Sequence, residues 1–178
     1  DLRYTPSPTA LEGMAGHALV AGRRGAHYET EVRLEGADAS GTLRVRGRAD
    51  GFDAARHRLE EIKTHRGDLA RQSQHQRQLH WAQLKVYGAL LCAARGLPAL
   101  TLALVYFDLG TEHETAFEEQ SDAATLQAFF AEQCARFMAW AAQEQTPRQA
   151  RDAALAALAF PHAEFRNGQR TLAEAVYR

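Results

Sequence analysis

Cysteine is scarce in this chain of 178 residues, which contains only Cys92 and Cys134. Neither has the nearby Cys-x-x-Cys partner that would indicate a zinc or iron–sulfur site. Both fall within apolar helical patterns, so we expect buried thiols in a reducing compartment. The scarcity therefore argues against a disulfide scaffold and against a thiolate metal centre.

Long apolar runs are absent as well, since no stretch of about eighteen apolar residues occurs. The start lacks the basic, apolar and small-residue succession of a signal peptide. We therefore expect a protein that has no membrane partner and resides in the cytoplasm. The chain begins with Asp1 rather than Met, from which we expect a segment of a longer protein.

Lysine is nearly absent too, because Lys63 and Lys85 stand against 19 arginines. The formal net charge of −1 excludes a protein coated in positive charge, so any surface for nucleic acid must be local. Arg66, Arg71 and Arg77 form such a local basic cluster. Lysine differs from arginine in being a compact ammonium whose pKa responds to its site, and we take Lys63 as required by chemistry.

The hydrophobic pattern predicts an α/β fold with a central mixed sheet flanked by helices. Residues 9–22 and 72–95 are predicted helices, with a Thr9–Glu12 capping box on the first and a glycine end on the second. The predicted strands cover 28–34, 41–50, 59–64, 100–109 and 112–118, the fourth being central and the fifth an edge. Two further helices are predicted, from a Ser121 cap to about 145 and from Pro147 to about 159.

Three acidic and basic side chains occur in an order that suggests catalysis. In a strand, alternate side chains share a face, so Glu61 and Lys63 lie together while Glu60 and Ile62 point the other way. If the strand that ends at Asp50 pairs with the strand of Glu61, two carboxylates meet, which suits a divalent cation. The alternative is an ordinary exposed ion pair that contributes little.

The predicted helix 72–95 carries a polar stripe. Gln76, His80, Gln83 and Tyr87 follow at intervals of four, three and four, so they share one face. Such a stripe can line a groove for nucleic acid, or it can be a solvated face with a tyrosine at its edge.

Together these motifs resemble those of the PD-(D/E)xK nuclease superfamily, and most closely its RecB-like branch, over roughly residues 9–145. Asp50 in Gly-Arg-Ala-Asp-Gly is similar to the family's metal-binding Asp. Glu61 and Lys63 are similar to its Glu-x-Lys, and Gln83 with Tyr87 to its Gln-x-x-x-Tyr. His17 is similar to the additional histidine ligand of this branch, although a lone histidine on an apolar helix is often a hydrogen-bonded core residue.

The resemblance implies a restriction-endonuclease-like core at residues 1–146 and a metal-dependent deoxyribonuclease that cuts single-stranded DNA. Catalytic roles would fall to Asp50, Glu61 and Lys63. The metal, Mg²⁺ or Mn²⁺, would be held by Asp50, Glu61, His17 and the Ile62 carbonyl, with imidazole favouring manganese. Substrate would contact the residues of the helical stripe and Arg66. An iron–sulfur cluster, present in some members of the branch, would need four cysteines and is not expected in this segment.

The tail suggests a partner domain. Residues 160–170 resemble the adenine-recognising segment that precedes the phosphate loop in XPD/DinG-like helicases, with Phe165, Arg166 and Gln169 as the nucleotide-binding residues. Residues 147–178 would then be a helical connector to a helicase motor in the same chain, although no phosphate loop follows here. The alternative is an ordinary C-terminal helix.

Two other functions fit the same sequence. The domain would be a catalytically silent nuclease fold that binds DNA and delivers it to a helicase, or an interaction domain indifferent to nucleic acid. Metal-dependent cleavage separates the nuclease from the first, and salt-dependent DNA affinity separates both from the second.

Overall fold

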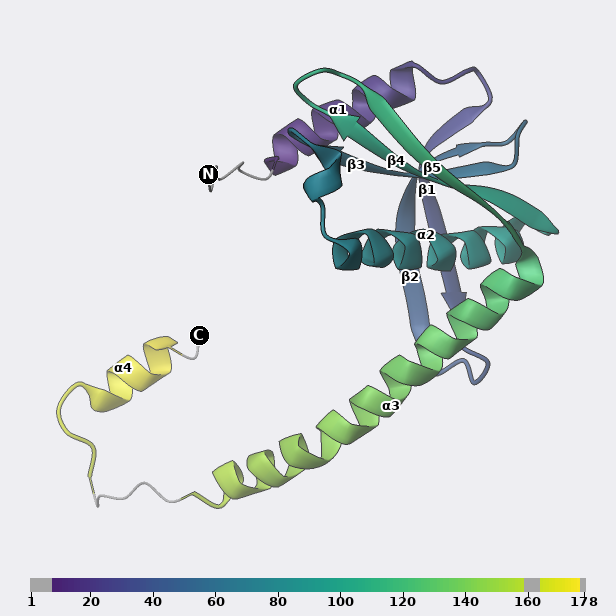
Figure 1. The fold of residues 1–178 in the computed structure, drawn as a ribbon. Helices are drawn as coiled ribbons and strands as arrows, with labels where there is room; N and C mark the ends of the chain where they lie inside the picture. Colours follow the sequence, from purple (N-terminus) through teal and green to yellow (C-terminus); the bar gives the residue numbers. More distant parts are fainter. Residues whose placement is uncertain (1–7, 159–163, 177–178) are drawn as a thin grey trace. The chain divides into compact units, whose positions relative to one another are not determined.

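A five-stranded mixed sheet forms the centre of the protein (Figure 1). The computed structural model describes residues 8–158 and 164–176. The strands are β1 (Tyr28–Ala37), β2 (Arg44–Asp53), β3 (Arg58–His65), β4 (Ala99–Asp108) and β5 (Glu114–Asp122), and they lie in sequence order across the sheet. The β1–β2, β2–β3 and β4–β5 pairs are antiparallel, whereas β3 and β4 are parallel. The predicted α/β class with a mixed sheet is confirmed.

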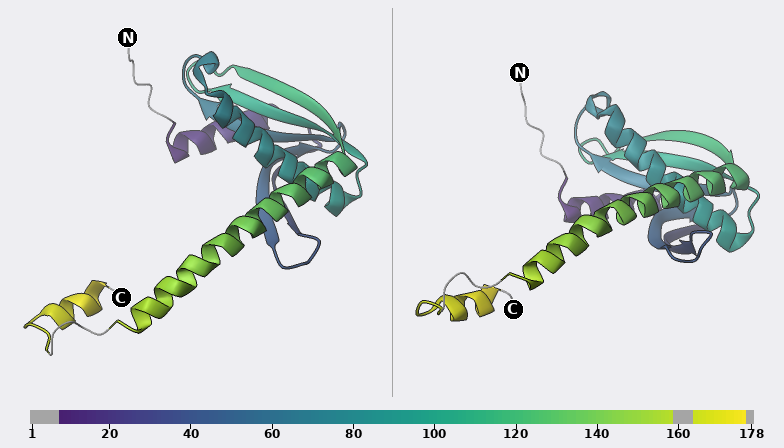
Figure 2. Two further views of the ribbon diagram at one scale, coloured as in Figure 1. Left: turned by 60° about the horizontal axis from the view of Figure 1, so that its bottom comes forward. Right: turned by 90° about the horizontal axis from the view of Figure 1, so that it is seen from below.

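Helices cover both faces of this sheet. Helix α1 (Ala10–Gly22) packs on one face, where Val20 joins the buried side chains of Ile62 and Phe107. Helix α2 (Gln74–Arg95) and the first part of α3 (Ala123–Ala156) cover the other face through residues such as Leu84 and Leu126. Figure 2 shows the two sides of the sheet from further directions. The apolar run of β4 is therefore buried on both faces, as expected for a central strand.

The boundaries of α1 follow its capping residues. Thr9 accepts the backbone N–H of Glu12, and the Glu12 carboxylate accepts the backbone N–H of Thr9, so the predicted capping box is confirmed. Gly16 faces the sheet, because a Cβ atom there would lie 2.5 Å from Thr64 Cγ2 and 3.2 Å from Phe107 Cδ1. The absence of a side chain thus lets α1 approach the strands closely.

Two predicted helix boundaries were wrong. Helix α2 begins at Gln74 with Ser73 as its N-cap, and a short 3₁₀ turn, η1 (Leu69–Arg71), precedes it. Helix α3 begins at Ala123, and its cap is Asp122, the last residue of β5, whose carboxylate accepts the Thr125 N–H.

The predicted break at Thr146–Pro147 was also wrong, because α3 continues through Pro147 to Ala156. Proline removes one helical hydrogen bond and crowds the preceding turn. The neighbouring residues 142–150 are all exposed, so water can satisfy the carbonyl group that loses its partner. Pro147 therefore does not end α3, because the surrounding helix is exposed to solvent.

The chain divides into two compact units, residues 1–137 and 138–178. Within the second unit, helix α4 (Gln169–Val176) follows a turn at Gly168, near the predicted amphipathic helix 171–177. The predicted domain boundary at residues 146 and 147 stays a prediction.

Among the described residues, no helix combines the length and the apolar character needed to cross a membrane.

We expect Gly16→Ala to weaken the packing of α1 on the sheet. Relative to Gly22→Ala, where an added Cβ meets nothing within 4 Å, its free energy of unfolding should be lower by about 1–3 kcal/mol, the usual penalty for overpacking. Both changes gain similar helix propensity, so the difference reports the contact. Urea unfolding measures it, and equal stabilities would show that α1 does not require the close approach.

Candidate active site

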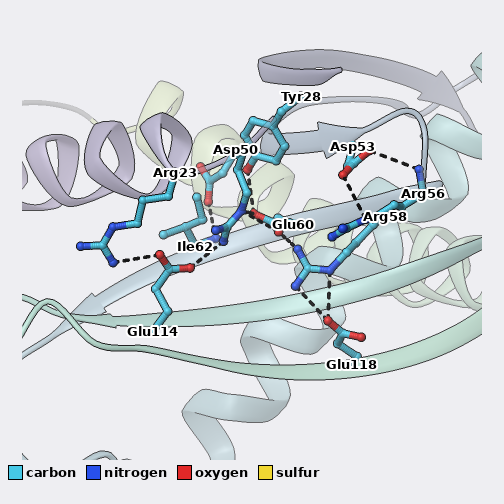
Figure 3. Close-up of polar contacts among 11 residues, drawn as sticks. Arg23, Tyr28, Asp50, Asp53, Arg56, Arg58, Glu60, Ile62, Glu114 and Glu118 are labelled. Carbon is cyan, nitrogen blue, oxygen red and sulfur yellow. Dashed lines mark hydrogen bonds and ion pairs between the residues drawn. The ribbon is translucent and has the colours of Figure 1, made fainter. Parts of the chain in front are cut away.

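The pairing of β2 with β3 gives way to a side-chain contact at Asp50. The paired residues are Gly51 with Glu60, Phe52 with Leu59 and Asp53 with Arg58. One residue further, the Asp50 carboxylate accepts the backbone N–H of Ile62 at 2.6 Å (Figure 3). A side chain thus replaces the backbone at this position, and the carboxylate is fixed between the two strands.

His17 reaches this carboxylate from helix α1. Its Nδ1 atom lies 3.3 Å from Asp50 Oδ1, and the imidazole side chain is 33% exposed. The hydrogen bond with Asp50 raises the pKa of His17, an effect that burial opposes. The histidine is therefore neither a core residue nor an isolated surface group, because it contacts the acidic side chain that the sequence analysis paired with it.

Glu61 and Lys63 lie on the same face of β3, as predicted. Lys63 Nζ lies 2.6 Å from Glu61 Oε1, and the Glu61 side chain is only 3% exposed. Burial, followed by the charge of Asp50, raises the pKa of Glu61 to about 7 against the opposing effect of Lys63. The setting of Glu61 therefore disfavours its ionised form.

Helix α2 completes the cluster from the other face of the sheet. Gln83 Oε1 accepts a hydrogen bond from Lys63 Nζ at 3.2 Å, and Gln83 Nε2 donates to the Tyr87 hydroxyl at 3.2 Å. The Tyr87 ring lies against Gly47 of β2, where a Cβ atom would collide with it. The predicted Gln-x-x-x-Tyr pair therefore contacts the lysine and both strands.

The remaining members of the predicted stripe lie in different surroundings. His80 Nδ1 is 2.9 Å from the hydroxyl of Tyr106, and burial lowers the pKa of His80 with a further contribution from the charge of Lys63. Gln76 is exposed in the first turn of α2. Arg66 pairs with Glu12 of α1 at 2.5 Å, a contact that the sequence analysis missed because 54 residues separate them.

A second acidic cluster lies behind the first, on the α1 face of the sheet. Glu60 is fully buried and forms ion pairs with Arg24 and Arg58, while the Tyr28 hydroxyl donates to it at 2.8 Å (Figure 3). Burial raises the pKa of Tyr28 to about 12, so this hydroxyl keeps its proton. Sequence analysis placed the side chains of Glu60 and Glu61 on opposite faces of the strand but did not identify the partners of Glu60.

The tail residues lie apart from these clusters in the chain and belong to the second unit. Arg166 N–H donates to Gln169 Oε1 at 2.8 Å, just before helix α4, and Phe165 is 47% exposed. Residues 160–163 of the predicted adenine-recognising segment lie outside the described residues. The proposed nucleotide contacts of Phe165, Arg166 and Gln169 stay predictions.

The donor set has two distinct features with respect to a metal ion. Within residues 8–158 and 164–176, no three His, Cys, Asp or Glu side chains are grouped so that they could hold a metal ion. Glu61 Oε2, however, is buried and has no hydrogen-bond partner. A buried carboxylate oxygen without a donor is costly unless a cation or water satisfies it. The partnerless Glu61 oxygen is the feature of this site that would suit a bound cation.

When a chelator removes metal ions, ionisation of Glu61 should lower the free energy of unfolding. Its pKa rises from 4.5 to about 7 on folding, so the folded state keeps a proton that the unfolded chain loses between these values. Stability therefore falls as pH rises through this window and is constant above it. We expect Glu61→Gln to exceed wild type by about 3 kcal/mol near pH 8 and to match it near pH 4.

Urea unfolding in EDTA at a series of pH values measures this difference. An advantage of Glu61→Gln that is the same at every pH would contradict the assignment of the raised pKa to Glu61.

We expect Glu60→Ala to be strongly destabilising, because it leaves Arg24 and Arg58 without their buried partner. Loss of one member of a buried ion pair costs about 3–5 kcal/mol. The control is Glu118→Ala, which removes a 52% exposed partner of Arg58 and should cost less than about 1 kcal/mol. Thermal and urea unfolding test the pair, and similar losses for both variants would refute the role of burial.

The chain has no match among protein family models, and no curated protein matches it. Among solved structures it is similar to the protein in "Crystal structure of SSO0001", with 27% sequence identity over 73% of this chain and a TM-score of 0.48. The chain covers 61% of the length of that protein.

Proposed function

We propose that this protein is a metal-dependent deoxyribonuclease of the PD-(D/E)xK superfamily, RecB-like branch. One observation carries the proposal, a network of contacts that runs from α1 across β2 and β3 to α2. His17 contacts Asp50, and Asp50 accepts the N–H of Ile62, which lies between Glu61 and Lys63 in β3. Glu61 pairs with Lys63, and Lys63 donates to Gln83. Separate motifs of the sequence thus converge in space. A chance ion pair on one strand would not require partners from two helices on opposite faces of the sheet.

The order of elements supports the same proposal. A helix, three antiparallel strands, a helix and a strand parallel to the third follow one another along the chain. This is the order expected for the restriction-endonuclease-like core that the sequence resembles. The fold by itself would not specify an activity, so the argument rests on the side chains.

The donors suit a hard divalent cation. Asp50, Glu61 and His17, with the Ile62 carbonyl as the resemblance implies, would hold Mg²⁺ or Mn²⁺. A bound cation of this kind lowers the pKa of water and neutralises charge that develops during phosphodiester hydrolysis. The raised pKa of Glu61 and its partnerless Oε2 are the features that such a cation would relieve.

Lys63 is the group best placed to act on the nucleophile or on the phosphate. Its ammonium is held by Glu61 and Gln83 and remains 27% exposed, so it retains access to a substrate. An ammonium in this position orients the attacking water or compensates negative charge in the transition state. Gln83 and Tyr87 restrict its position, since the amide bridges the lysine and the phenol.

Single-stranded DNA is the proposed substrate, and a helicase motor in the same chain is the proposed partner. Both proposals derive from the resemblance of the nuclease motifs and of the segment around Phe165, Arg166 and Gln169. The arginines that follow β3 in the sequence, Arg66, Arg71 and Arg77, would contact the phosphates of the DNA. Cleavage should therefore weaken as salt is raised, because binding releases counterions from the DNA.

The nuclease proposal is tested with purified protein, manganese and labelled single-stranded DNA. We expect Asp50→Ala, Glu61→Ala and Lys63→Ala each to lower the cleavage rate by about 100-fold or more, the loss typical for removal of a transition-state stabilising group. Lys85→Ala is the matched control, because Lys85 pairs with Glu119 away from the network. Its rate should equal that of wild type.

Equal cleavage by wild type and the three site variants would attribute the activity to a contaminant and refute the proposal. Metal-independent, salt-sensitive DNA binding without cleavage by wild type would favour the silent DNA-binding module. Without DNA affinity, the interaction domain would be the remaining alternative.

A further inference from the structure

A pocket of about 620 Å³ opens beside the proposed active site, between α1 and the strands β1 and β2. His17 and Asp50 form one part of its lining, so the pocket borders two of the proposed metal ligands. Its volume lies in the range that holds a ligand the size of one nucleotide, roughly 300–1,000 Å³. It is distinct from the polar stripe of α2, which approaches the network from the other face of the sheet.

The two walls of this pocket differ in chemistry. The wall from α1 is apolar and includes Met14 and Ala18, with the Met14 side chain 69% exposed. The wall from the strands is polar and includes Thr30, Glu31 and Arg48. A flat apolar group can lie against the first wall while an anionic group contacts the second.

Arg48, the cation of the polar wall, forms only an exposed ion pair. Arg48 Nε lies 2.5 Å from Glu31 Oε2, and these side chains are 64% and 51% exposed. Exposed ion pairs of this kind contribute little to stability. An anionic ligand can therefore replace Glu31 as the partner of Arg48 with little loss of stability. Arginine is the side chain best suited to bind a phosphate.

The strand backbone is distorted at the same place. Glu31 has φ of +57°, whereas its neighbours Thr30 and Val32 pair regularly with Gly51 and Ala49. A left-handed conformation is strained for a residue other than glycine, and such strained residues recur at ligand sites. Glu31 lies opposite Asp50 and lines the pocket, so the strained residue is part of the cavity wall.

We propose that this pocket receives one unpaired nucleotide adjacent to the scissile phosphate. Its base stacks against Met14 and Ala18, and its phosphate binds Arg48. The base must be unpaired, because a base within a duplex is stacked on both faces and cannot lie against a protein wall. The proposal rests on the proposed nuclease function and extends it, since it assigns a structural basis for single-stranded specificity.

The test measures DNA binding in EDTA, without cleavage, by fluorescence anisotropy of a labelled oligothymidine. Ala18→Trp fills the pocket from an exposed position, and Arg48→Ala removes its cation. Each should raise the Kd for single-stranded DNA by at least tenfold, about 1.4 kcal/mol. A blunt hairpin duplex should bind more weakly than the single strand, and neither variant should change its Kd.

Two variants serve as matched controls. Ala15→Trp adds the same bulk at an exposed position of α1 outside the pocket lining. Arg46→Ala removes the same charge from β2, where Arg46 makes a comparable exposed pair with Glu35. Both should stay within about twofold of wild type, which separates loss of the pocket from loss of charge or of stability.

Equal Kd values for Ala18→Trp, Arg48→Ala and their controls would overturn the pocket, even if wild type cleaves DNA with manganese. Selective loss of binding by the two pocket variants would support it, even if wild type does not cleave. Duplex affinity that equals single-stranded affinity and falls with the same variants would overturn the assignment to an unpaired nucleotide.

Discussion

The hydrogen bond between the Asp50 carboxylate and the Ile62 N–H is the contact on which the candidate site depends. It joins β2 to β3 at the position where backbone pairing ends at Gly51 and Glu60. The Asp50 side chain is held between the two strands and is 16% exposed. His17 can contact it from α1, while Glu61, Lys63 and Gln83 gather on the α2 side.

Burial gives this arrangement its electrostatic character. Burial and the charge of Asp50 both disfavour the ionised form of Glu61, and Lys63 only partly offsets them. Two acids so placed are unfavourable for folding, which is typical of sites kept for chemistry rather than stability. The apolar faces of β3 and β4 supply the stability that tolerates this cost.

Sequence periodicity was sufficient for much of the fold and for most of the network. Alternation in β3 placed Glu61 with Lys63, and four-residue spacing in α2 placed Gln83 with Tyr87, because both patterns are local. Contacts between distant segments were not available from such patterns. The pairing of Arg66 with Glu12 and of Arg24 with Glu60 depends on how α1 packs on the sheet. Pro147 was misread because its effect depends on solvent access around α3.

The adjacent glutamates of β3 would be interchangeable if the strand slipped by one residue, since either carboxylate could then face the network. The half-buried arginines Arg24 and Arg58 disfavour such a slip, because it would move Glu60 out of their reach and leave them only their more exposed partners, Glu114 and Glu118. An ion pair on the reverse side of the sheet thus acts as a register lock. It determines which of two identical neighbours lies beside Lys63, and it does so from the opposite face of the strand.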